Sequence, residues 1–366
     1  MSNKKIGIVT LYGNNNFGNK LQNYALQTYL EKQGCIVDTL IINNLPKLNA
    51  SFSYKIKNFV KTGFKKNIFN LINKKFYDKT TIVDNKELQR INIFKQFSTD
   101  FLNEIFLDYL NINFGKKIDE YDYFVIGSDQ VWGINAAIYY YKSFLFFASP
   151  NKRLSYAGSF GIPKLPSYVK PYFKKYFMEM EAISVREESG AKIVEELLNI
   201  KVPIHVDPTM LLSVNEWSEI ALENDISCDD GYILAYFLKE NKKRSNKIRS
   251  FAYSSNLKII ELMNKDDFSY ISGPQEYLGY IKNAKFLFTD SFHGCVFAIL
   301  FGIPFKVYKR GQMNCRINTL LKKFMVNNNS GIFMNDKEQF LINSSKTNQV
   351  LQMERMKVDS YFRQFI

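Results

Sequence analysis

Short apolar runs alternate with helical stretches along most of the chain. The first run, Lys5 to Leu11, leads into a turn rich in asparagine and glycine, and a helix follows that ends at Gly34. A second apolar run occupies 35–42. Runs without polar alternation are typical of strands buried on both faces of a parallel sheet. The strand–helix–strand order predicts a doubly wound α/β domain.

This order continues beyond the first unit. Further strands are predicted at 121–126, 153–157, 182–185, 202–206, 232–237, 258–262, 285–288 and 305–308. A polar, acidic stretch between 213 and 231 interrupts the pattern, as expected at a domain boundary. A chain of 366 residues also exceeds what one hydrophobic core usually supports.

We therefore expect an α/β protein with two Rossmann-like domains that face a cleft. The first domain spans 1–212 and carries a basic helical insertion at about 47–115. The second spans 213–350, and 351–366 forms a C-terminal helix that can pack back on the first domain.

Ligands of such sheets bind at the carboxyl ends of the strands, where backbone N–H groups and helix N-termini point into a crevice. Polar and small residues gather at several of these ends. The candidates for the acceptor side or the cleft are Asn14, Asn15, Asn16, Asn19, Ser128, Asp129, Gln130 and Ser159. The glycines here match neither a dinucleotide fingerprint nor a P-loop.

The turn Thr289-Asp-Ser-Phe-His293-Gly294 is the main candidate for chemistry. His293 is one of only two histidines, and a histidine at a helix N-terminus in a cleft is suited to proton transfer. His205 alternates with apolar neighbours and is expected to be a packed structural residue. Arg186 ends a buried strand and can clamp a carboxylate or phosphate, or pair with its neighbours Glu187 and Glu188.

Cysteine spacing and the scattered acids give no sign of a metal site or a disulfide framework. The four cysteines lie far apart, and the two histidines are distant from each other. We therefore expect no metal and no cofactor.

Much of the net charge of +14 is local. Between residues 47 and 79 there are nine lysines and one acid, threaded with apolar residues at roughly helical spacing. This segment is a solvated helical face, a surface for anionic lipid or a polyanionic acceptor, or a nucleic-acid contact. No nucleic-acid motif accompanies it, so we expect no nucleic-acid partner.

No apolar run reaches the length of a membrane span, and the N-terminus leads directly into a strand. We expect a cytoplasmic protein, with peripheral attachment at the inner face of the membrane through 47–79 as an open alternative. The oligomeric state stays open.

Six motifs in order resemble the polysaccharide pyruvyl transferase family, and the resemblance spans nearly the whole chain. They are Gly7–Asn19 with Leu21–Gln27, Ile126–Trp132, Ser155–Gly161, Ser184–Glu188, Asp207–Thr209 and Thr289–Gly294. The resemblance implies an architecture like that of the GT-B glycosyltransferases. It also implies transfer of a pyruvyl group from phosphoenolpyruvate to sugar hydroxyls of a bacterial capsule or cell-wall polysaccharide, or of its lipid-linked oligosaccharide precursor, as a ketal.

The resemblance also implies roles for residues. His293 matches the catalytic histidine, and Arg186 matches a donor-binding arginine of some members. Ser291 and Gly294 of the same turn are also expected to bind the donor, although some members have an arginine at the position of Ser291. Arg310 and Arg316 are candidate clamps for the donor from the facing loop.

Two other functions stay open. A glycosyltransferase with a nucleotide-sugar donor would fit Ser291 and the uncharged turn at Asn14, Asn15 and Asn16. A non-catalytic protein that binds glycans or a membrane surface would use the segment 47–79.

Overall fold

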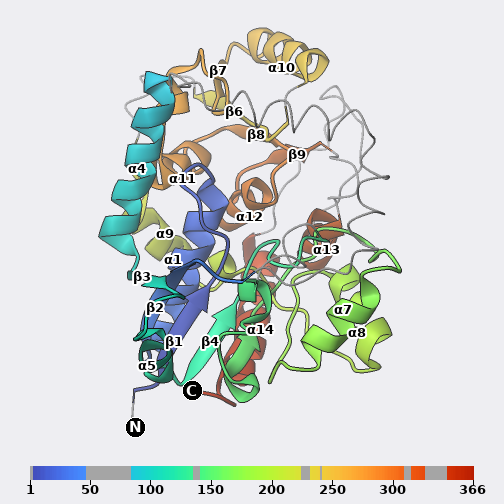
Figure 1. Ribbon diagram of the computed structural model, residues 1–366. Helices are drawn as coiled ribbons and strands as arrows, with labels where there is room; N and C mark the ends of the chain where they lie inside the picture. The colour runs from blue at the N-terminus through green and yellow to red at the C-terminus, as the bar shows by residue number, and fades with distance from the viewer. Residues whose placement is uncertain are drawn as a thin grey trace, which may run out of the picture.

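The computed structural model of the chain describes residues 3–46, 84–134, 141–223, 231–239, 241–308, 315–325 and 344–366. Two parallel sheets organise them (Figure 1). The basic segment 47–79 lies outside the described residues, so its interpretation stays a prediction. Among the described residues, no helix is both long and apolar enough to cross a membrane.

The first sheet has the strand order β3-β2-β1-β4-β5, and every strand pair in it is parallel. The strands β2 and β3 lie on one side of β1, whereas β4 and β5 lie on the other. The crevice between the ends of β1 and β4 is therefore a topological switch point, where ligands of such sheets bind. The strands are β1 (Lys5–Val9), β2 (Ile36–Asn43), β3 (Glu104–Asp108), β4 (Tyr123–Ile126) and β5 (Arg153–Ser155).

The second sheet has the order β7-β6-β8-β9 and is also parallel. Its switch point lies between β6 and β8. The expectation of two Rossmann-like units is confirmed by these two sheets. The strands are β6 (Tyr232–Tyr236), β7 (Lys258–Glu261), β8 (Phe286–Thr289) and β9 (Phe305–Val307).

Helices connect the strands and fill the space between the sheets. In Figure 1 the second sheet lies above the first, with α11 and α12 between them. The helices are α1 (Phe17–Lys32), α4 (Asn85–Phe101), α5 (Phe114–Asp119), α7 (Lys170–Phe177), α8 (Glu188–Leu198), α9 (Val214–Ile220), α10 (Lys242–Ser254), α11 (Pro274–Lys282), α12 (Phe292–Phe301), α13 (Cys315–Lys323) and α14 (Ser344–Phe362). Short 3-10 turns occupy η1 (Tyr141–Phe144), η2 (Pro150–Lys152), η3 (Pro208–Met210) and η4 (Phe268–Ile271).

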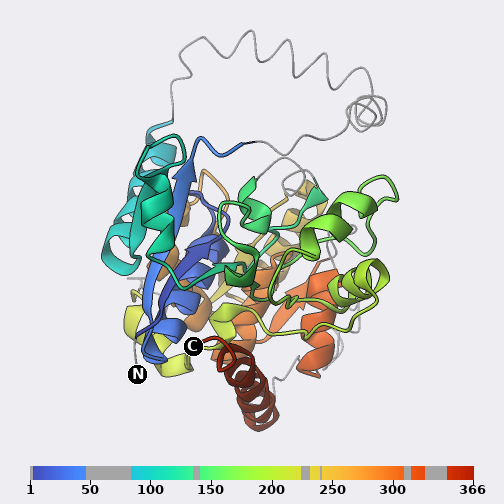
Figure 2. The same cartoon turned by 60° about the horizontal axis from the view of Figure 1, so that its bottom comes forward.

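Two helices cross from one half of the chain to the other. Helix α4 packs against η4 and α11 of the second half, where the buried Arg90 donates to the Tyr270 carbonyl at 2.7 Å. Helix α14 comes forward in Figure 2. Its Tyr361 hydroxyl donates to the Ser155 carbonyl at 2.7 Å, and its Asp359 accepts from the Tyr29 hydroxyl at 2.7 Å. These crossings join the two halves into one packed core.

Two sequence expectations need correction. The insertion expected to be helical over about 47–115 contains a strand, because β3 pairs in parallel with β2 at the edge of the first sheet. The strands expected at 182–185 and 202–206 occur only as single bridges, such as Val185 with Ile204. Pro203 lacks a backbone N–H, so this segment cannot form a continuous ladder.

The apolar run from Phe286 to Phe301 divides into β8 and α12 at a polar turn. The Ser291 side chain caps α12 by accepting from the Gly294 N–H at 3.3 Å. Serine oxygens at this position satisfy an N–H that the helix leaves unpaired. The helix is buried over almost its whole length and ends at Gly302, whose φ of 71° suits glycine. This local chemistry places His293 in the first turn of a buried helix.

Candidate active site

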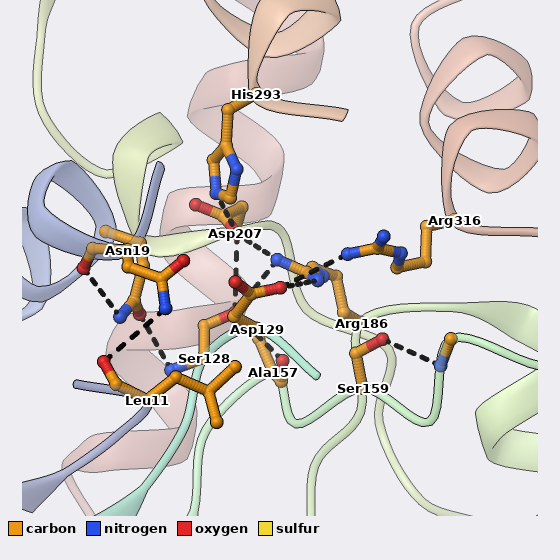
Figure 3. Close-up of polar contacts among 12 residues, drawn as sticks. Leu11, Asn19, Ser128, Asp129, Ala157, Ser159, Arg186, Asp207, His293 and Arg316 are labelled. Atoms are coloured by element: carbon orange, nitrogen blue, oxygen red, sulfur yellow. Dashed lines mark hydrogen bonds and ion pairs between the residues drawn. The ribbon is translucent and has the colours of Figure 1, made fainter. Parts of the chain in front are cut away.

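Turns from both sheets meet in a buried cluster of charged side chains. His293 comes from the start of α12, Arg316 from α13, and Asp129 from the turn after β4. Arg186 and Asp207 follow the two bridging segments beside β5. Figure 3 shows these five side chains converging between the sheets. All five are at most 7% exposed.

His293 lies beside Asp207. The His293 Nε2 atom is 3.5 Å from the Asp207 Oδ2 atom, which is at the long limit of hydrogen-bond distances. The contact therefore orients the ring mainly through charge. Asp207 is held in turn by the Thr209 hydroxyl, which donates to its Oδ1 atom at 2.7 Å.

Gly18 in the first turn of α1 supports the other side of the imidazole. A β-carbon at position 18 would overlap the His293 Nδ1 atom. The ring therefore depends on the absence of a side chain at this position. Helix α1 follows β1 of the first sheet, and α12 follows β8 of the second sheet. This contact therefore joins the turn after β1 to the catalytic candidate on the second sheet.

The two arginines share one carboxylate. Arg186 donates to Asp207 through Nη1, and its Nη2 is 3.1 Å from Asp129 Oδ1. The Arg316 Nη1 atom lies 3.2 Å from the same Asp129 oxygen. Both guanidinium groups also lie over the Phe292 ring, at 4.4 Å and 5.6 Å from its centroid. Cations over an aromatic face are attracted by the ring quadrupole.

Opposite charges keep the cluster ionised despite its burial. Burial alone would raise the pKa values of the carboxyl groups, but the neighbouring cationic groups hold the pKa of Asp207 well below its ordinary value and also lower that of Asp129. Burial alone would lower the pKa of Arg186, but the carboxylates of Asp207 and Asp129 raise it. A buried charge is stable only when it is compensated in this way.

Arg186 does not use its sequence neighbours as ion-pair partners in the described structure. The Oε1 atom of Glu187 accepts from the Ser159 hydroxyl at 3.0 Å and from two backbone N–H groups of the turn. Glu188 pairs with Lys322 at 2.6 Å. Ser159 thus shapes the turn after β5 and does not point to the cluster.

The remaining polar candidates line the first sheet's switch point. Asn16 caps α1, and the buried Asn19 donates to the Leu11 carbonyl at 3.5 Å. Asn14 lies beside this turn, and its Oδ1 atom is buried without a partner among the described residues, whereas Asn15 is exposed. The Ser128 hydroxyl donates to the Ala157 carbonyl at 3.0 Å.

Three further predicted residues lie elsewhere. Gln130 packs its amide against Gly161 in the next turn. Gly294 lies against Thr289, where a β-carbon would come within 2.7 Å of the hydroxyl oxygen. Arg310 lies outside the described residues, so its role as a clamp stays a prediction.

Sequence reasoning missed three residues of this cluster: Asp207, Phe292 and Gly18. From the sequence, Asp207 was named only as part of the motif Asp207–Thr209 and was assigned no role in the site. Asp207 directly follows a bridging segment, as Arg186 does. A carboxylate in this position is the sequence feature that could have identified it. Phe292 and Gly18 are packing partners, so no chemical pattern in the sequence marks them.

The cavity beside the cluster is small. It is lined by Arg186, Asp207, Phe292 and Arg316 and has a volume of about 10 Å³. That is at most the space of one water molecule. This cavity alone is therefore too small to hold a substrate.

Within the described part of the chain, no group of three or more His, Cys, Asp or Glu side chains is placed to hold a metal ion. The cluster is built of one imidazole, two guanidinium groups and two carboxylates. These groups can transfer a proton and bind an anion.

Comparison with known proteins assigns the class. A family model for polysaccharide pyruvyl transferase matches residues 16–308, so the chain belongs to this family. The match includes Arg186 and His293, whereas Arg316 lies beyond it. The family indicates a transferase that acts on a polysaccharide. No curated protein matches the chain.

Solved structures with a similar arrangement include enzymes that bind nucleotide sugars. The UDP-GlcNAc 2-epimerase from Neisseria meningitidis, bound to UDP-GlcNAc, is 10% identical, covers 99% of this chain and 93% of its own, and has a TM-score of 0.48. A putative UDP-N-acetylglucosamine 2-epimerase from Listeria monocytogenes is 9% identical, with 96% and 91% covered and a TM-score of 0.47. At these scores the likeness carries no argument about function.

The contact between Gly18 and His293 is testable by NMR. With only two histidines in the chain, the ring signals of His293 and His205 can be assigned by substitution. Gly18→Ala should shift the His293 ring signals, because the added methyl overlaps Nδ1, and leave those of His205 in place. Gly13→Ala is the matched control, since its β-carbon would only meet the Asn15 Oδ1 atom at 3.6 Å. Unchanged His293 signals in Gly18→Ala would refute the contact.

His205 makes stability depend on pH. Burial, together with the nearby Lys323, lowers its pKa from 6.5 to about 4. The folded ring therefore stays neutral while the unfolded chain binds a proton below pH 6.5. This contribution to stability is complete above pH 6.5 and is lost as pH falls towards 4, by a total on the order of 3 kcal/mol.

Urea unfolding of the wild type and of His205→Phe across this pH range measures the effect. The phenylalanine keeps the ring between Tyr156 and Tyr361, whose centroids lie 5.7 Å and 4.9 Å away. The variant should lose less stability on acidification than the wild type. Equal losses would show that His205 titrates normally in the folded state.

Proposed function

We propose that the chain transfers a pyruvyl group from phosphoenolpyruvate to hydroxyl groups of a cell-surface polysaccharide or its lipid-linked precursor, and forms a ketal. The observation that carries this proposal is the placement of His293 between Asp207 and Gly18, next to two buried arginines. Membership of the polysaccharide pyruvyl transferase family supports it.

The proposed chemistry balances without any cofactor. A proton adds to the methylene carbon of phosphoenolpyruvate, which leaves an oxocarbenium-like centre at the neighbouring carbon. One sugar hydroxyl attacks this centre and loses its proton, phosphate then leaves, and a second hydroxyl closes the ketal. The products are the ketal and inorganic phosphate. This sequence requires an acid/base group and cations that bind a carboxylate and a phosphate.

His293 is proposed to transfer the proton. It is held from two sides, so the direction in which its ring presents a proton is defined. Asp207 acts as a positioning residue, because its low pKa keeps it ionised beside the imidazole at neutral pH.

Arg186 and Arg316 are proposed to bind the donor. Guanidinium groups match the geometry of carboxylates and phosphates. At present the Asp129 carboxylate lies between them, at 3.1 Å and 3.2 Å. An anionic donor would displace the Asp129 carboxylate from this position when the small cavity opens. In the absence of a donor, Asp129 keeps the two cations in place.

The acceptor is proposed to bind along the first sheet, where Asn14, Asn19 and Ser128 lie at the switch point between β1 and β4. Amide and hydroxyl groups suit the hydrogen bonds of a sugar. We propose a cytoplasmic protein, attached at the inner face of the membrane through 47–79 if its acceptor is lipid-linked. The glycosyltransferase alternative is favoured by no contact in the described residues.

Substitution of His293 tests the proposal. With phosphoenolpyruvate and an accepted glycan, His293→Gln should release phosphate about 100-fold more slowly than the wild type, because an amide cannot transfer the proton. His205→Phe replaces the other histidine and is the matched control, with a rate close to that of the wild type. Phosphate release by His293→Gln at the wild-type rate would exclude the proposed role.

A further inference from the structure

A second cavity lies in the other half of the molecule, at the carboxyl ends of β6 and β7 and the start of α10. Its volume is about 650 Å³, which is within the usual range of ligand sites. The walls include Phe237, Arg244, Arg249, Glu261, Met263 and Lys265. None of the residues discussed for proton transfer or donor binding lines it.

Arg244 is the buried cation of this cavity. Its side chain is only 10% exposed, and its guanidinium carbon lies 3.5 Å from the centroid of the Phe237 ring. Nη2 donates to the Lys239 carbonyl, and Nη1 is 3.7 Å from the Asp290 carboxylate. The Nε atom is buried and has no hydrogen-bond partner within the described ranges.

The charge of Arg244 is less well compensated than that of Arg186. Arg186 has two carboxylates, which raise its pKa despite complete burial. For Arg244 burial lowers the pKa, and Asp290 only partly offsets this effect. A partly compensated guanidinium whose buried Nε–H has no partner among the described residues is suited to an anionic ligand at the wall of a cavity.

The charge of the helix that carries Arg244 also favours an anionic ligand. The stretch 239–249 contains six basic residues and one acid, and the first turn of α10 has no acidic residue. Cations are unfavourable at a helix N-terminus, where the helix dipole is positive, whereas anions are stabilised there. A bound anion would remove this conflict.

The other cations that line the cavity are already paired. Arg249 pairs with Glu261 through Nη2, and Lys265 lies 3.2 Å from Asp84 of the segment before α4. Both cations are about half exposed at the rim. Arg244 is therefore the group that would bind an anionic ligand directly. The two rim cations would attract the ligand more weakly.

The cavity adjoins the candidate active site through Asp290. The Asp290 Oδ1 atom accepts from the Leu238 N–H at 2.7 Å, and this contact spans the switch point between β6 and β8. Asp290 lies three residues before His293 on the same turn. A ligand on Arg244 would thus lie next to the turn that carries the histidine.

We propose that this cavity binds a phosphate or diphosphate group of a substrate, with Arg244 as its anchor. The identity of that substrate rests on the proposed function, in which Arg186 and Arg316 already bind phosphoenolpyruvate. The remaining source is the diphosphate of an activated or lipid-linked acceptor, and a loss of phosphoenolpyruvate affinity in Arg244→Gln would show instead that the donor's phosphate binds here.

Calorimetric titration of the full chain with inorganic pyrophosphate tests the site directly. Arg244→Gln should weaken binding by about tenfold or more, since a charge-assisted contact is lost. Lys247→Gln removes the same charge from an exposed position of the same helix that does not line the cavity, and should bind like the wild type. Equal affinities of wild type and Arg244→Gln, or equal losses in both variants, would overturn the proposal.

Two further arms complete the experiment. Titration with phosphoenolpyruvate and with uridine diphosphate shows which probe loses affinity in Arg244→Gln and so identifies the source of the phosphate group. If circular dichroism shows that Arg244→Gln is not folded, Arg249→Gln combined with Lys265→Gln replaces it. This variant removes the weaker rim charges, so a loss of pyrophosphate affinity smaller than about tenfold is expected, and an unchanged affinity would overturn the proposal. The readout is binding, so a chain that releases no phosphate from phosphoenolpyruvate would contradict the proposed function and leave this result intact.

Discussion

One carboxylate holds the site together. Asp129, after β4 of the first sheet, lies between Arg186 of its own half and Arg316 of α13, at 3.1 Å and 3.2 Å. These charges are buried, and breaking a buried pair by removal of one partner leaves an uncompensated charge that costs several kcal/mol. The arrangement of the two sheets is therefore tied to the charge balance of the site. The proposed function assigns these two cations to an anionic donor.

The closed cluster explains how one set of residues can be both stable and reactive. In the proposed function, the Asp129 carboxylate occupies the position that an anionic group of the donor would take. The cavity of about 10 Å³ beside these side chains is too small for a donor. In this proposal, the free energy of donor binding must offset the loss of the ion pairs of Asp129. The donor is then selected by charge as well as by shape. Arg244, which lies beside the same turn and is only partly compensated, needs no such displacement, because its cavity is already formed.

The sequence was sufficient for the elements whose signal is local. The strand at 285–288, the polar turn and the helix with His293 follow from apolar runs and from turn residues, and Arg186 follows from its place at a strand end. The strand β3 was missed because it is five residues long and directly follows the polar helix α4. The partners of Asp129 could not be predicted, because they depend on how two sheets face each other. Gly18 shows the same limit, since the ring it accommodates is 275 positions away.

The central claim is that His293 delivers a proton to the methylene carbon of phosphoenolpyruvate and thereby starts pyruvyl transfer. The most direct measurement is mass spectrometry of the product formed in deuterium oxide from phosphoenolpyruvate and an accepted glycan. The account predicts a pyruvate ketal whose methyl group carries a single deuterium. A ketal without deuterium in its methyl group, or a product enlarged by a sugar residue from a nucleotide-sugar donor, would contradict it.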